Sequence, residues 1–143
     1  MFEPQRSMGS ILAIAASGMA AASLRLEVSA SNIANMSDTG PLPGTNAPNP
    51  SGSPPAYAPL RVDQIDVAGG GTAATVTTVS PSYVPSYDPG ASYAEKNGMV
   101  AAPNVDLANE FVQQITARYA FALNAKVMQV DSEMMKALLD IKA

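Results

Sequence analysis

Residues 104–143 of this chain read NVDLANEFVQQITARYAFALNAKVMQVDSEMMKALLDIKA, a stretch without proline or glycine. Because both residues disfavour helix interiors, their absence over this length favours one long helix. Asp106 is placed to cap the first turn, and Glu110 lies where the helix dipole favours an acid. The sequence therefore predicts a helix from about Asp106 to Lys142.

Apolar side chains recur along this predicted helix at nearly the helical period and so form one continuous stripe. A helix of this length is about 55 Å long, whereas a compact domain of this size has a radius of gyration of about 14 Å. The molecule is therefore expected to be elongated, or the helix packs against neighbouring subunits that cover the stripe. The residues expected to make these contacts are Ile115, Tyr119, Leu123, Val127, Met134 and Leu138.

A second helix is expected near the N-terminus, because residues 5–39 contain no proline. Apolar and small residues alternate in steps of four and three from Met8 to Ile33, which is a heptad repeat that favours packing on a partner helix. The helix is predicted over about residues 7–35, with a close packing contact at Gly18. Its expected interface residues are Leu12, Met19, Leu26 and Ile33, and the residues expected to terminate it are Asn32 and Asn35.

The middle of the chain is rich in proline and glycine. Residues 40–59 are an uncharged loop that is expected to be mobile in isolation. Residues 60–67 and 72–79 are rich in β-branched side chains and flank three glycines, which predicts a β-hairpin. Residues 81–103 are expected to be irregular, with three tyrosines packed under the hairpin: Tyr83, Tyr87 and Tyr93.

Together these features predict a mainly α fold with a small β part. The two terminal helices are expected to pair antiparallel as a coiled-coil-like unit, joined by a Pro/Gly-rich segment that contains the hairpin. Four segments follow from this organisation: an N-terminal assembly helix (1–39), a Pro/Gly-rich loop (40–59), a hairpin with irregular chain (60–103) and a C-terminal assembly helix (104–143).

Composition excludes several kinds of chemistry. The chain has no histidine and no cysteine, so histidine and thiolate catalysis, Cys/His zinc sites and disulfides are absent. Its net charge of −4 argues against nucleic acid as a partner. The glycines 69–71 lack the residues that complete a phosphate loop, and Asp63 and Asp66 are best explained as solvated strand charges. We expect no catalytic residue, no metal site and no cofactor.

The N-terminus allows two interpretations. Arg6 followed by an apolar stretch up to Leu24 resembles a secretory signal. Against this, the heptad continues without a break to Ile33, so cleavage would discard half of a well-formed helix. A membrane span is disfavoured because serine, glycine and alanine make the stretch only weakly hydrophobic.

Two sets of motifs carry a family resemblance. ASGMA at 16–20 and LRLEVSASNIAN at 24–35 resemble the N-terminal motif of the axial proteins of the bacterial flagellum. YDP at 87–89 and PNV at 103–105, together with the long final helix, are similar to the small proximal rod subunits of that family.

This resemblance implies a structural subunit rather than an enzyme. The subunit would leave the cell uncleaved through the flagellar type III export channel and join the basal-body rod that spans the periplasm. Implied partners are copies of itself, proximal and distal rod proteins, the rod-base adaptor and the MS-ring/export gate region, with no nucleic acid and no direct membrane span. Two alternatives remain: another rod or hook-type axial subunit, and a signal-bearing periplasmic binding protein.

Overall fold

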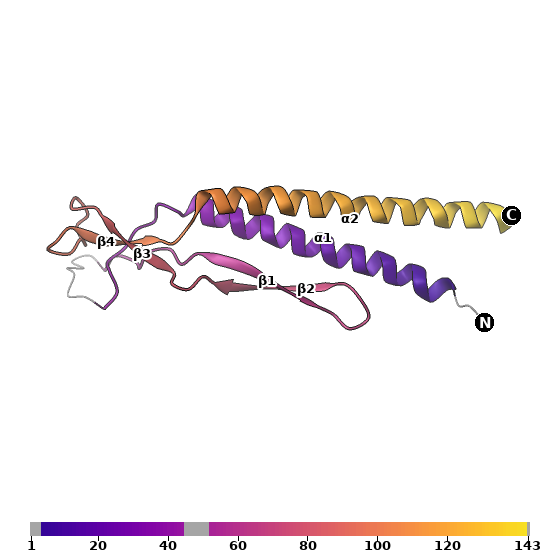
Figure 1. The fold of residues 1–143 in the computed structure, drawn as a ribbon, viewed down its shortest axis with the longest axis horizontal. Helices are drawn as coiled ribbons and strands as arrows, with labels where there is room; N and C mark the ends of the chain where they lie inside the picture. The colour runs from indigo at the N-terminus through magenta and orange to yellow at the C-terminus, as the bar shows by residue number, and fades with distance from the viewer. Residues whose placement is uncertain (1–3, 45–51, 143) are drawn as a thin grey trace. The chain divides into compact units, whose positions relative to one another are not determined.

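The computed structural model describes residues 4–44 and 52–142. The fold is mainly helical with a small β part (Figure 1). Contacts divide the chain into two compact units: a first unit of residues up to Glu27, Val62–Thr75 and residues from Val112 onward, and a second unit of Val28–Arg61 and Val76–Phe111. The elements in chain order are α1 (Pro4–Ala34), β1 (Leu60–Asp66), β2 (Thr72–Thr78), β3 (Tyr83–Tyr87), β4 (Met99–Pro103) and α2 (Leu107–Lys142).

Both long helices lie close to their predicted bounds. Helix α1 ends at Ala34, and the amide of Asn35 still donates to the Ser31 carbonyl at 3.1 Å. Helix α2 begins directly after Asp106, whose Oδ1 accepts the amides of Ala108 at 2.9 Å and Asn109 at 3.2 Å. The predicted N-cap is therefore confirmed, because its carboxylate satisfies two amides that the helix itself leaves without partners.

Within the first unit, α1 and α2 pack against each other and run in opposite directions (Figure 1). The two helices approach each other closely at Gly18, where an added Cβ would lie 2.7 Å from Nδ2 of Asn124. This close contact explains a glycine inside the helix, where it costs about 1 kcal/mol relative to alanine. The expected tight contact at Gly18 is confirmed.

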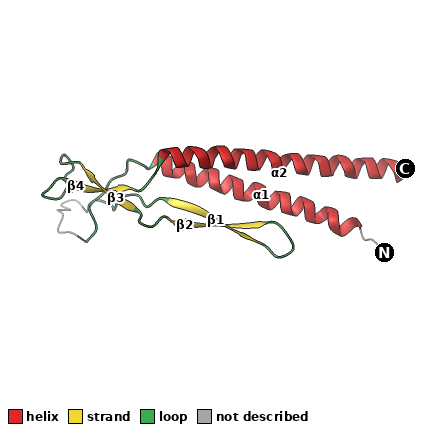
Figure 2. Ribbon diagram, viewed as in Figure 1, coloured by secondary structure: helices red, strands yellow, loops and turns green. Residues whose placement is uncertain are grey.

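Strands β1 and β2 form the predicted hairpin, one of two strand pairs shown in yellow in Figure 2. The turn is made by Gly69, Gly70 and Gly71, all with φ between 94° and 98°. In the first unit this turn packs on α1, because the amide of Thr72 donates to Oγ of Ser17 at 3.1 Å. The hairpin tip is thereby fixed to the N-terminal helix.

The second unit contains a strand pair where the sequence predicted irregular chain. Strands β3 and β4 are antiparallel and pair Pro85 with Ala101 and Tyr83 with Pro103. Gly40 adds a bridge on the other side of β4, since its amide and carbonyl both bond to Ala101. The prediction failed because proline normally argues against a strand; here both strands are short, and β3 is an edge strand.

The three tyrosines lie in the second unit, and their packing under the hairpin stays a prediction. Tyr83 and Tyr87 belong to β3 itself, and the hydroxyl of Tyr93 lies 2.7 Å from Oγ1 of Thr39. Part of the loop predicted at 40–59 lies outside the described residues, at 45–51. Of the rest, Gly40 is buried and the amide of Tyr57 donates to the Asp38 carbonyl at 3.0 Å, so both described flanks of the loop are attached to the second unit.

Candidate assembly surface

The side chain of Asn32, which is 2% exposed, hydrogen-bonds to several segments of the second unit. Its Nδ2 donates to the Leu60 carbonyl at 2.8 Å and to Oε1 of Glu110 at 2.7 Å. Its Oδ1 accepts the Leu60 amide at 2.9 Å and the Tyr57 hydroxyl at 3.1 Å. One buried amide therefore joins the end of α1, the start of β1 and the first turn of α2, with its hydrogen-bonding groups satisfied.

Neighbouring residues of the same motif extend this network. Oγ of Ser29 donates to the Glu110 carbonyl at 3.1 Å, and the Ser31 hydroxyl lies 3.1 Å from that of Tyr57. Asn35, in contrast, bonds locally, through Nδ2 to the Ser31 carbonyl at 2.9 Å. The two asparagines that the sequence grouped as helix-terminating thus lie in different settings: Asn35 follows the last helical residue, and Asn32 lies within the helix.

In the first unit, α2 presents a line of small or polar residues to α1. Ala117, Asn124 and Asp131 recur every seven residues and therefore share one helix face. Ala117 is fully buried and Asn124 meets Gly18. On α1 the buried residues of this unit are equally small: Ala15, Ala21 and Ala22. The contact between the helices of one chain is thus made by small residues.

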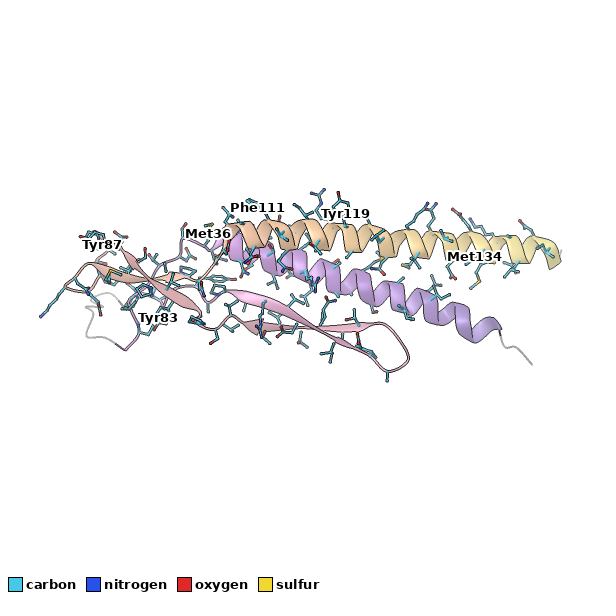
Figure 3. All side chains as sticks on the ribbon, viewed as in Figure 1. Met36, Tyr83, Tyr87, Phe111, Tyr119 and Met134 are labelled. Carbon is cyan, nitrogen blue, oxygen red and sulfur yellow. The ribbon has the colours of Figure 1, made fainter. Side chains whose placement is uncertain are left out.

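The apolar stripe of α2 runs beside this contact and remains exposed. Tyr119 is 69% exposed, Leu123 67% and Leu138 56%. Figure 3 shows Tyr119 on the side of α2 that faces away from α1. An exposed apolar surface of this kind is typical of an interaction site. Every residue predicted from α2 belongs to it: Ile115, Tyr119, Leu123, Val127, Met134 and Leu138.

The interface residues predicted from α1 are partly covered. Leu12, Met19, Leu26 and Ile33 are all half-buried, whereas the alternate heptad positions Ala15, Ala22 and Ser29 are buried. The two sets of heptad positions therefore differ: the small residues are buried within the chain, and the larger residues beside them stay partly exposed to solvent.

Asp131 is the charged residue on the face of α2 that also carries Ala117 and Asn124. It is 1% exposed, and neither carboxylate oxygen has a hydrogen-bond partner among the described residues. Its neighbours along α2, Val130 and Ser132, are exposed, so the local pattern contained no signal for its burial.

The described residues contain no group of three or more acidic side chains that could hold a metal ion. The surface is thus distinguished by packing and hydrogen bonding and not by a reactive cluster.

Comparison with known proteins identifies the family of the chain. Residues 12–41 match the family described as "Flagella basal body rod protein", and residues 96–141 match "Flagellar basal body rod FlgEFG protein C-terminal". These matches contain both long helices, including Asn32 and the apolar stripe. They define the class: structural components of the bacterial flagellar rod.

Whole-chain relatives narrow the class further. The chain is 38% identical to the flagellar basal-body rod protein FlgC of Salmonella typhimurium over 134 residues, covering 90% of this chain and 93% of the relative. It is 36% identical to FlgC of Escherichia coli O6:H1 and 28% identical to FlgC of Agrobacterium fabrum, again over 90% of this chain. The chain therefore belongs to the flagellar basal-body rod protein family, within which it is FlgC-like. It is a structural protein of the basal body and not an enzyme.

Proposed function

We propose that this chain polymerises through its terminal helices into the rod that transmits torque through the basal body. Segments 1–39 and 104–143 act as the assembly helices and form coiled-coil-like packing with the helices of neighbouring subunits. The observation that carries the proposal is the apolar stripe of α2, which stays exposed although α1 packs along the same helix.

The energetics of the stripe favour assembly. Full burial of a side chain such as Leu123 stabilises a complex by about 1.5–3 kcal/mol. The stripe repeats such residues along most of α2, and two further apolar residues, Phe111 and Leu139, are 51% and 68% exposed. Their combined burial offsets the cost of ordering and associating the subunits.

The contacts are proposed to be heterologous, so that a groove on one subunit receives a different face of the next. Contacts of this type do not close on themselves and therefore generate an open helical assembly. The proposed neighbours are copies of this chain and other proximal and distal rod proteins, with the rod-base adaptor and the MS-ring/export gate region at the base. The subunit is exported uncleaved by the flagellar type III system into the periplasm and is required for motility.

The test of this function places a charge in the stripe. Leu123→Asp, 67% exposed in the single chain, should leave the fold intact and exclude the subunit from isolated basal bodies, because an unpaired carboxylate cannot be buried at the interface. Leu26→Asp should act in the same way on the N-terminal helix. The readouts are the amount of chain in purified basal bodies and swimming in soft agar.

Ser132→Asp is the matched control, since it places the same charge at an exposed polar position of α2. This variant should assemble normally and support swimming. Normal incorporation of Leu123→Asp, or a deletion strain that still swims, would contradict the proposed function.

A further inference from the structure

A groove runs along α2 in the first unit, beside α1. Its lining is mainly apolar and comes from both helices, with Met134 on the α1-facing side of α2 (Figure 3). Leu123, Val127, Val130 and Met134 follow the spacing of one helix face, so the groove has the shape into which a further helix packs. The residues that line it are Ile11, Leu123, Val127, Val130, Met134 and, as its two charged members, Lys126 and Asp131.

The groove contains an uncompensated charge. Both oxygens of Asp131 lie without a partner among the described residues, and the residue is 1% exposed. Lys126 lines the same groove, but its Nζ donates to Oε1 of Gln129 at 3.0 Å, and no described hydrogen bond joins it to Asp131. A buried carboxylate without a partner is strongly unfavourable, so the groove is suited to an occupant that brings a cation.

A complementary face exists on the same helix. Ile115, Arg118, Tyr119 and Ala122 are spaced i, i+3, i+4 and i+7 and line one shallow hollow in the first unit. Arg118 is exposed, while Arg25 of the same unit is half-buried. An arginine among apolar side chains is suited to a buried ion pair, because its guanidinium donates two parallel hydrogen bonds to a carboxylate.

We propose, on the basis of the assembly described above, that the groove receives the Arg118 face of α2 from a second copy of this chain. The incoming Arg118 displaces the side chains that cover Asp131 in the single chain, its guanidinium donates to the Asp131 carboxylate, and the apolar residues around both close the contact. Arg118 and Asp131 are 13 positions apart on one helix, so parallel copies would be staggered by about 20 Å. Each copy offers one groove and one Arg118 face, so the contact repeats indefinitely.

The test uses charge reversal in the source bacterium, with the native gene deleted and variants supplied in its place. Arg118→Glu alone and Asp131→Lys alone should each lower the amount of chain in purified basal bodies at least tenfold. Co-expression of the two variants should restore incorporation to within about threefold of the wild type. Where the two variants alternate, every groove meets the opposite charge. The Lys-bearing groove of the Asp131→Lys variant receives the Glu-bearing face of the Arg118→Glu variant. The unchanged Asp131 of the Arg118→Glu variant in turn receives the unchanged Arg118 of the Asp131→Lys variant.

Four further variants keep the test decisive. Lys136→Glu reverses an exposed charge elsewhere on α2 and should incorporate normally. If Asp131→Lys loses its helical circular dichroism, the isosteric pair Asp131→Asn and Arg118→Gln replaces it. Combining D131N and R118Q in one chain should then cost no more incorporation than either alone, because both remove one interaction.

The pairing is overturned if Arg118→Glu incorporates like the wild type, if co-expressed folded variants fail to rescue each other, or if D131N and R118Q act additively. If Leu123→Asp is excluded from basal bodies while Arg118→Glu enters them, the proposed function stands and only this pairing fails. Normal entry of Leu123→Asp would instead remove the assembly role on which the pairing rests.

Discussion

Asn32 makes four hydrogen bonds to groups that lie 25 to 78 positions away in sequence. Its role is therefore to connect segments. Three of these bonds go to the backbone of Leu60 and to the carboxylate of Glu110, groups that have few alternative partners once they are buried. The SASNIAN stretch at 29–35 can then be explained physically: Ser29, Ser31 and Asn32 all bond within one network, whereas Asn35 bonds only to the turn before it.

Asn32→Ala should lower the free energy of unfolding by about 3 kcal/mol, because it leaves more than one buried polar group without a partner. Asn35→Ala removes a local bond and should cost about 1 kcal/mol or less. Urea unfolding of the purified chain, followed by circular dichroism, measures both. Equal losses for the two variants would contradict the network described for Asn32.

At the scale of elements, α1 has properties that suit two different environments. By length and composition, Ile11–Ala34 is apolar enough to cross a membrane, and signal sequences and core helices pass the same criterion. In this chain half of the sixteen apolar residues of that stretch are alanines, three of which are buried in the first unit. The helix also continues to Ala34 and ends in the Asn32 network. Both halves of the helix therefore make contacts within the folded chain.

We therefore expect α1 to be retained in the assembled rod. Mass spectrometry of the chain extracted from purified basal bodies should find peptides that contain Ile11 to Leu24. A mature chain that begins near Ser23 would contradict this expectation and support a cleaved signal. The reason is energetic: removal of residues before Ser23 would delete Gly18 and Ser17, and with them the contacts to Asn124 and Thr72.

Sequence patterns predicted the helices and the first hairpin because those signals are local. Asp106, Gly18 and the glycines 69–71 act through neighbours or through a simple need for space. The second strand pair was missed because Pro85 and Pro103 lie in it, and pairing with Ala101 and Tyr83 depends on residues far along the chain.

The period of the apolar stripe predicted which residues share a face but not what that face contacts. The 3.6-residue spacing indicated which residues share a face, but it cannot tell whether that face packs within the chain or outside it. The structure shows that the internal contact is made by Ala117, Asn124 and the small residues of α1. The burial of Asp131 could not be predicted for the same reason.

At the scale of the whole molecule, the distribution of side-chain size is the reverse of that in a self-sufficient globular protein. The buried apolar residues described are alanines and valines, whereas leucines, isoleucines and tyrosines are prominent among the exposed ones. A chain with this distribution is suited to bury its apolar stripe against neighbours, as the proposed function requires, and it belongs to a family of rod subunits.

Hydroxyl-radical footprinting of Tyr119 and Met134, in the free subunit and in purified basal bodies, tests this claim most directly. Both side chains react readily with radicals, and they are 69% and 48% exposed in the single chain. We predict that both are oxidised in the free subunit and that oxidation falls at least fivefold in the assembled rod. Equal oxidation in the two states would show that the stripe still faces solvent after assembly, which would contradict the proposed packing of α2.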